Sequence, residues 1–318
     1  DSKTTGRARS TVNKASFLPL YRKARLTGAR CGGGRPKDQT LRRIFQQVFG
    51  VTPIDYLGTQ RLLLAKQLLT DTDLPVTQVA LACGHASLRR FNAAFLQHYR
   101  MNPSALRRQA AAPRAGVPVL RLAYRPPYDI AGLMRFLALR QLPGTEAVDA
   151  LQWCRTLRCE HAGGELRGWL QARFVPQRHE VELSLAPQLM PAVGTVMQRV
   201  RHALDLDADP SLIGPAIASL PVAAAEGLRL PGALDGFETA VRIVLGQQVT
   251  VAAARTLARR LLDEFGEDID TPHPGLRRLF PSAAQIASAD PARLGRLGIV
   301  RQRVTALQAL ARAMAEGR

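Results

Sequence analysis

The sequence predicts a multidomain, mainly α-helical protein, in which a helical domain is followed by a small α+β domain and then by an all-α region. The chain has 318 residues, which is room for two or three domains, and its 46% hydrophobic residues supply their cores. Helical periodicity dominates residues 39–109 and 208–318, whereas the two-residue alternation of strands is confined to residues 117–207. Residues 110–116 are the expected linker, and residues 1–38 form a separate basic segment.

Positive charge is concentrated in the first third of the chain. The formal net charge is +19, and residues 1–114 account for +15 of it. This distribution indicates an anionic partner, and double-stranded DNA is favoured over a membrane because no long basic amphipathic helix carries bulky aromatic anchors. The alternative is that arginine is simply abundant, but abundance alone would not concentrate the charge.

No membrane span, disulfide framework or metal site is expected. No apolar run approaches the roughly 20 residues that cross a bilayer, and no signal peptide is recognisable, so a cytoplasmic, nucleoid-associated location is expected. The cysteines are too sparse for a disulfide framework and should be reduced; they are Cys31, Cys83, Cys154 and Cys159. His161 near Cys154 and Cys159 suggests zinc, but a fourth ligand at suitable spacing is missing, so we expect neither a metal nor another cofactor.

The basic segment at residues 1–38 shows no sustained periodicity, so we expect it to be disordered or aberrant. Order begins at Thr40, where apolar residues recur at helical spacing up to Phe49, and Gly50 ends that helix. A second helix is predicted over residues 54–69 by the same periodicity.

A helix-turn-helix is predicted at residues 74–108, in LPVTQVALACGHASLRRFNAAFLQHYRMNPSALRR. A short helix from Val76 ends before Gly84, and Ser87 is placed to cap the second helix. The residues that should face outward at the start of this second helix are Leu88, Arg89 and Asn92. Arginine can bind guanine and asparagine can bind adenine through two hydrogen bonds, although a solvated surface helix would show the same residues.

This segment resembles AraC/XylS-type transcription regulators in three successive motifs: GH, then RRFNAAF, then Pro103-Ser104. The resemblance implies sequence-specific binding to promoter sites, with RNA polymerase as a further candidate partner. It also implies a first helix-turn-helix unit, with residues 40–49 as its recognition helix. The residues that this helix would present to DNA are Gln39, Arg42, Arg43 and Gln46. Its supporting helix should lie just upstream, and residues 1–38 contain no pattern for it.

Alternating polar and apolar residues predict strands in the middle domain. Strands are expected at residues 119–124 and 179–185, with two more on either side of the Gly163-Gly164 turn. Helices are expected at residues 129–140 and 190–204. These strands and helices together predict a small α+β domain.

Two helices joined by a polar turn are predicted in LPGALDGFETAVRIVLGQQVTVAAARTLARRLLDEFG, residues 230–266. Asp235 and Thr250 are placed to cap them. Gln247 and Gln248 occupy the connection, where their amides could bind base edges or cap neighbouring backbone. The residue pattern alone favours capping, because most polar pairs at helix junctions satisfy local backbone.

The same segment resembles the AlkA-type 3-methyladenine DNA glycosylases of the helix-hairpin-helix superfamily. The likeness extends to LRLAYRPPYDIAGLMRFLALR at 120–140 and to FPSAAQIASADPARLGRLGIVRQRVTALQALARAMAEG at 280–317. It implies base excision repair, in which an alkylated base is flipped from the duplex and its N-glycosidic bond is hydrolysed. It further implies Gln248 as the wedge that fills the gap, Gln247 beside the base pocket, and Phe136 as an aromatic pocket wall. Without the family, Phe136 would be an ordinary core residue.

An AraC-type region ahead of an AlkA-like region resembles Ada-type alkylation-response proteins. Those proteins usually begin with a four-cysteine zinc domain that accepts methyl groups from phosphotriesters. Here Cys31 is the only cysteine before position 83, so methyl sensing cannot be assigned.

The glycosylase hairpin motif and the catalytic Asp that the resemblance implies are not found in the sequence. Leu142 to Thr145 resembles the motif but lies in the wrong domain, and Glu316 is the only carboxylate side chain after Asp290. The catalytic Asp is therefore expected beyond Arg318, and we expect residues 1–318 alone to excise bases poorly or not at all. Two functions stay open: part of a bifunctional alkylation-repair protein, or a catalytically inactive AraC-type transcriptional regulator.

Overall fold

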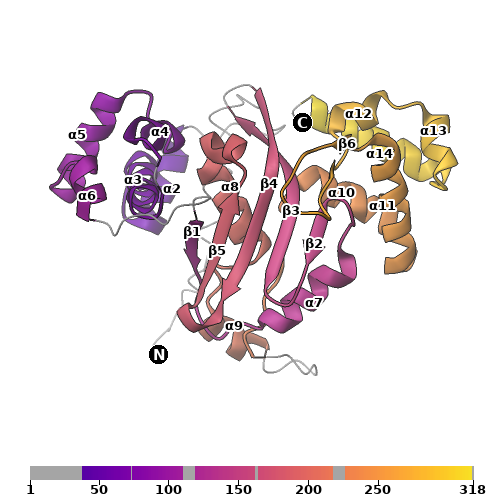
Figure 1. Ribbon diagram of the computed structural model, residues 1–318, viewed down its shortest axis with the longest axis horizontal. Helices are drawn as coiled ribbons and strands as arrows, with labels where there is room; N and C mark the ends of the chain where they lie inside the picture. Colours follow the sequence, from indigo (N-terminus) through magenta and orange to yellow (C-terminus); the bar gives the residue numbers. More distant parts are fainter. Residues whose placement is uncertain (1–37, 73, 110–118, 162–163, 218–225, 317–318) are drawn as a thin grey trace, which may run out of the picture. The chain divides into compact units, whose positions relative to one another are not determined.

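The structure of the chain is a computed structural model that describes residues 38–72, 74–109, 119–161, 164–217 and 226–316 (Figure 1). The chain divides into two compact units, residues 1–59 and 60–318. Several predictions lie outside the described residues: those for residues 1–37 with Cys31, for the linker at 110–116 and for Gly163 of the predicted turn. Arg318 also lies outside them, so the catalytic Asp expected beyond this residue stays a prediction.

The first unit contains helix α2 (Asp38–Phe49) and the first residues of helix α3 (Pro53–Asp71). Phe45 is buried; its ring stacks on Phe49 at a centroid distance of 4.2 Å and meets the edge of Tyr56 at 5.6 Å. Gly50 adopts a φ of +75°, a conformation that favours glycine, so it ends α2 as predicted.

The second unit begins with the rest of α3 and the predicted helix-turn-helix. Its helices are α4 (Val76–Ala82), α5 (Leu88–Tyr99) and α6 (Pro103–Gln109). Gly84 turns the chain between α4 and α5 with a φ of +78°, and the Ser87 side chain accepts a hydrogen bond from the Arg90 N–H at 3.5 Å. Phe91 and Phe95 are fully buried and fix the inner face of α5. The turn and the cap predicted from the sequence are both present.

A five-stranded antiparallel sheet follows, with strand order β1-β5-β4-β3-β2 (Figure 1). The strands are β1 (Val119–Ala123), β2 (Glu146–Val148), β3 (Gln152–His161), β4 (Gly164–Val175) and β5 (Glu180–Leu185). The four predicted strands are present. The short edge strand β2 was not predicted, because three residues are too few to show an alternating pattern.

Helices accompany the sheet in the same part of the chain. They are α7 (Ile130–Arg140), the 3₁₀ helices η1 (Pro176–Arg178) and η2 (Pro187–Ala192), α8 (Val193–Ala203) and α9 (Pro210–Ile217). The helix expected over residues 190–204 was predicted to start too early. The α-helical part begins only at Val193, and the residues before it, Pro187–Ala192, form the 3₁₀ helix η2 instead.

The last part of the chain is built around a second hydrophobic core. Its helices are α10 (Gly236–Gly246), α11 (Val251–Phe265), α12 (Ala283–Ser288), α13 (Pro291–Arg296) and α14 (Arg301–Ala315), and its hairpin strands are β6 (Glu267–Asp268) and β7 (Arg278–Leu279). Within this part α14 packs on α10 and α12, and α10 packs on α11. The hairpin was not predicted. The predicted fold class, mainly helical with a small sheet in the middle of the chain, is confirmed, apart from this hairpin in the region predicted as all-α.

Leu142 belongs to this second core, although the sequence assigned Leu142 to Thr145 to the α+β domain alone. The corner is held there by hydrogen bonds from the Arg277 and Arg278 backbone N–H groups to the Gly144 carbonyl, at 2.9 and 3.0 Å. The α+β sheet and the C-terminal helices therefore share structure at this point. Of the helices described, none combines the length and apolar character required to cross a membrane.

Candidate nucleic-acid interface

The turn between α10 and α11 places two glutamines at the surface. Helix α10 starts at the Asp235 cap, whose carboxylate accepts the Glu238 N–H at 2.8 Å, and ends at Gly246. Gln247 is the C-cap residue, and Gln248 follows with a φ of +53°, in the left-handed region. Non-glycine residues occupy that region at a cost of about 1–2 kcal/mol, so the surrounding structure must fix it.

Capping at this junction is carried out by Thr250, whose hydroxyl accepts the Ala253 N–H at 3.2 Å. Gln247 and Gln248 are both exposed, and their side-chain amides form no hydrogen bond to the described residues. These amides are thus available to an external partner that carries donors and acceptors, such as base edges. The capping interpretation, favoured by the residue pattern alone, does not describe this geometry.

Phe136 lies on α7 and is 40% exposed, so it is not a core residue. The inner face of α7 is formed by Leu133 and Met134 instead. The Arg140 guanidinium lies 3.9 Å from the centre of the Phe136 ring, one helical turn away. The ring is therefore a partly exposed aromatic face with a cation over it.

Four charged residues, which we call the buried ion cluster, join α10 to the sheet. Arg155 on β3 lies 2.9 Å from Glu146 on β2 and 2.5 Å from Glu238 on α10. Arg242, one turn after Glu238, reaches the same two carboxylates at 3.3 and 3.1 Å. Two arginines balance two glutamates, so the buried charge is neutral overall. The cluster was not predicted from the sequence, since no local pattern connects residues so far apart in the chain.

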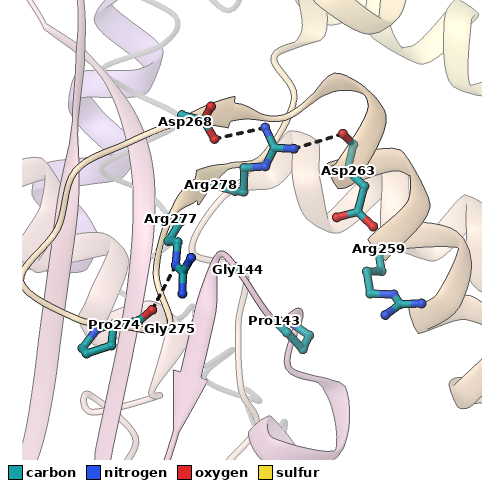
Figure 2. Close-up of a pocket in the computed structure, with 9 residues that line it drawn as sticks. All are labelled: Pro143, Gly144, Arg259, Asp263, Asp268, Pro274, Gly275, Arg277 and Arg278. Atoms are coloured by element: carbon teal, nitrogen blue, oxygen red, sulfur yellow. Dashed lines mark hydrogen bonds and ion pairs between the residues drawn. The ribbon is translucent and has the colours of Figure 1, made fainter.

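A cavity of about 460 Å³ opens where α11, the β6–β7 hairpin and the Gly144 corner meet (Figure 2). No aromatic side chain lines it; its residues are Pro143, Gly144, Arg259, Asp263, Asp268, Pro274, Gly275, Arg277 and Arg278. Arg278 is engaged within the fold, since it pairs with Asp268 at 3.2 Å and donates to the Asp263 main-chain oxygen at 3.1 Å. This cavity therefore lacks the aromatic faces between which an extruded base is held.

Helix α5 of the helix-turn-helix exposes Leu88 and Arg89 at its start, directly after the Ser87 cap. Asn92 is half-buried, and its Oδ1 is buried without a hydrogen-bond partner among the described residues. Because α5 turns by about 100° per residue, Asn92 lies nearer the helix-turn-helix core than Arg89 does. Its predicted outward orientation is therefore only partly met.

Helix α2, in the first unit, presents a polar exposed face. Arg42, Arg43, Gln46 and Gln47 line a shallow hollow of about 470 Å³. Three of these four residues, all except Gln47, were predicted to face DNA. The side chain of Gln39, the remaining member of that predicted set, lies outside the described part of the chain.

Three protein-family models match successive parts of the chain. A helix-turn-helix domain matches residues 37–109, an AlkA N-terminal domain matches residues 119–235, and the HhH-GPD superfamily base excision DNA repair protein model matches residues 241–318. DNA-3-methyladenine glycosylase 2 of Escherichia coli is 36% identical over 196 residues, which are 62% of this chain and 67% of that protein. The chain belongs to the AlkA-type DNA glycosylase family.

A relative from Mycobacterium tuberculosis is named "Probable bifunctional transcriptional activator/DNA repair enzyme AlkA". It is 35% identical over 287 residues, which are 87% of this AlkA-type chain and 56% of the relative, so the chain spans about half the length of that relative. The predicted fusion of an AraC-type helix-turn-helix to an AlkA-type glycosylase region is confirmed.

A solved 3-methyladenine DNA glycosylase from Archaeoglobus fulgidus aligns with a TM-score of 0.46 at 18% identity, over 60% of this chain and 65% of that one.

The cysteines of the AlkA-type chain that the structure describes, Cys83, Cys154 and Cys159, are buried free thiols. Burial raises the pKa of the Cys83 thiol to about 12 and that of Cys154 to about 11, which keeps both thiols protonated and unreactive at neutral pH. Over the described residues, no three His, Cys, Asp or Glu side chains lie close enough together to hold a metal ion.

Proposed function

We propose that this chain belongs to a protein that couples the control of alkylation-response genes to base excision repair. In this proposal the helix-turn-helix binds promoter sites, and the AlkA-type region binds alkylated DNA. The complete protein, whose catalytic Asp is expected beyond Arg318, then hydrolyses the N-glycosidic bond of 3-methyladenine and similar bases. The observation that carries the proposal is the exposed Gln247-Gln248 turn between two packed helices, inside the region that matches the glycosylase family.

The proposed recognition step takes a damaged nucleotide out of the base stack. The Gln248 side chain enters the vacated space and forms hydrogen bonds with the orphaned partner base. Gln247 lies beside the extruded base, and the partly exposed ring of Phe136 offers it a stacking face. Alkylated purines are electron-poor, which favours stacking on an electron-rich ring.

The decisive test uses the full-length gene product, because the chain spans only part of its relatives. Methylated genomic DNA is incubated with that protein, and released bases are separated by chromatography. Release of free 3-methyladenine supports the proposal. Undiminished promoter binding without base release would instead support the second candidate, a transcriptional regulator without catalysis that binds DNA through the capped and exposed start of α5.

Replacing Gln248 by alanine should weaken binding to a duplex that carries a stable abasic-site analogue by about tenfold, and should leave binding to the intact duplex unchanged. The reason is that only the duplex with a gap offers a space for the wedge. Fluorescence anisotropy with two labelled duplexes measures both affinities. The matched control is Gln188→Ala, an exposed glutamine on η2. Equal losses on both duplexes would count against Gln248 as the wedge.

Replacing Arg89 by alanine should relax sequence preference at one position of the promoter site, at a cost of about 1–3 kcal/mol for the preferred base pair. Selection of bound duplexes from a randomised pool, followed by sequencing, gives the preference of each variant. Arg90→Ala is the control, because Arg90 is also exposed and is adjacent on α5. We expect this control to lower affinity evenly across sequences; an unchanged preference in Arg89→Ala would remove Arg89 from the base contacts.

A further inference from the structure

We infer that Arg303 is a positioning residue for the DNA wedge: through the Gln247 main-chain oxygen it fixes the turn from which Gln248 projects. This inference rests on the wedge role proposed above for Gln248. It adds a residue from α14, 56 positions away in the sequence, to the lesion-recognition apparatus.

The contact that carries the inference is a hydrogen bond from Nη2 of Arg303 to the main-chain oxygen of Gln247, at 2.5 Å. Gln247 is the C-cap residue of α10, where helix carbonyl groups are left without intrahelical partners and carry partial negative charge. A guanidinium satisfies such a carbonyl well, because it is always charged and donates from a planar fork. Arg303 therefore completes the end of α10 from outside the helix.

The turn formed by Gln247 and Gln248 needs such support. Within the turn itself, the Gln247 N–H reaches the Val244 carbonyl only at 3.5 Å, which is a weak hydrogen bond. The next residue, Gln248, is held at a φ of +53°, a conformation that persists in a non-glycine residue only where its surroundings determine it. Without Arg303, the peptide between Gln247 and Gln248 is free to rotate, and the Gln248 side chain loses its fixed direction.

Helix α14, which carries Arg303, is held in place by buried contacts. Val304 and Leu307 are buried in the second hydrophobic core, and the side chain of Gln308 donates to the Ala289 carbonyl at 2.7 Å. Arg303 itself is half-buried at the first turn of this helix.

Arg301 offers a matched comparison on the same helix. It lies two residues earlier and is exposed, and its guanidinium forms no hydrogen bond or ion pair with the residues described. The two arginines thus share charge and helix turn but differ in the contact to Gln247.

The experiment compares Arg303→Gln with Arg301→Gln in the 318-residue chain. Affinities are measured for a duplex with a tetrahydrofuran abasic analogue and for the intact duplex, and their ratio gives the discrimination. We expect Arg303→Gln to reduce the ratio by about tenfold, and Arg301→Gln to lower both affinities equally. Arg303→Lys, which keeps one donor and the charge, should restore part of the discrimination.

Two further measurements separate positioning from a general loss of structure and from failure of the wedge proposal. Arg303→Gln should unfold within a few degrees of the parent chain, and in a Gln248→Ala background it should cause no additional loss of discrimination. If Gln248→Ala itself leaves the ratio intact, the wedge proposal fails and the inference falls with it. If Gln248→Ala lowers the ratio and Arg303→Gln does not, or lowers both affinities alike, the wedge stands and the role of Arg303 is overturned.

Discussion

Replacing Arg155 by methionine should lower the free energy of unfolding by about 3–5 kcal/mol, because it leaves two buried carboxylates without their closest cation. In the native chain the side chains of Arg155, Glu146 and Glu238 are each 7% exposed or less. Arg242 remains near both carboxylates in the variant, but it is 24% exposed and one charge cannot balance two. Urea unfolding followed by circular dichroism at pH 7 measures the loss.

The loss should depend on pH in a direction that the cluster fixes. Burial raises the pKa of Glu238 above its ordinary value of 4.5, and the positive charge of Arg155 opposes that rise. Removing Arg155 raises the folded-state pKa further. A carboxyl with a raised folded-state pKa contributes stability that is fully present below its unfolded-state pKa and is lost as the pH climbs toward the folded value. The defect of Arg155→Met should thus be smaller at pH 5 than at pH 8.

The control is an ion pair of the same chemistry in the same sheet that is more exposed than the cluster. Arg173 pairs with Glu182 across β4 and β5, and their side chains are 54% and 19% exposed. Arg173→Met should cost less than about 1 kcal/mol, because water screens the pair and hydrates the carboxylate that remains. A similarly small cost for Arg155→Met, or a loss of stability that grows as the pH falls, would contradict the role of the buried ion cluster in joining α10 to the sheet.

The parts of the fold that the sequence predicted correctly are those determined by neighbouring residues. Asp235 and Thr250 cap their helices as expected, because an N-cap needs only one side chain and a backbone N–H three residues on. Gly84 and Ser87 define the turn of the helix-turn-helix for the same local reason. Strands β1 and β5 were found from alternation, since a buried face repeats every second residue, and both alternate in burial.

The features that were missed depend on contacts between distant parts of the chain. Leu142 belongs to a core formed mainly by residues beyond position 236, and nothing in its own neighbourhood indicates that. In the sequence, Arg155 is indistinguishable from any other polar strand residue, because its partner Glu238 is close to it only in the folded structure. The contact from Arg303 to Gln247 joins a side chain to a main-chain oxygen, so no residue type marks its acceptor. Such pairings require the tertiary structure.

In the candidate interface too, some features follow from neighbouring residues and others need the tertiary structure. That Gln247 and Gln248 lie on a helix connection follows from the interrupted helical period. Whether their amides cap the backbone or face outward depends on which residue does the capping, and the Thr250 hydroxyl does it here. For Asn92 the prediction from helical periodicity was partly wrong: the residue was expected to face outward, but its Oδ1 is buried.

Replacing Phe95 by alanine should lower the free energy of unfolding by about 3–5 kcal/mol, the usual cost of deleting a buried aromatic ring. Phe95 is 0% exposed, and the centre of its ring lies 5.7 Å from that of Phe91 and 4.7 Å from that of Tyr99. Deleting the ring therefore leaves a cavity inside the core. The ring is the centre of the apolar face that holds α5 in place. Promoter binding should weaken in parallel, since α5 presents Arg89. Urea unfolding and anisotropy with promoter DNA measure the two effects.

Leu96→Ala is the matched control for this prediction, because Leu96 neighbours Phe95 on α5 but is 45% exposed. Its truncation removes little buried surface, and we expect a change within about 0.5 kcal/mol. Parallel losses of stability and promoter binding in Phe95→Ala alone would show that the DNA-reading helix depends on its aromatic underside. If Phe95→Ala kept full promoter affinity at a temperature where the helix pair is unfolded, α5 would not be the DNA-reading helix. The basic face of α2 would then remain as the described surface for promoter recognition.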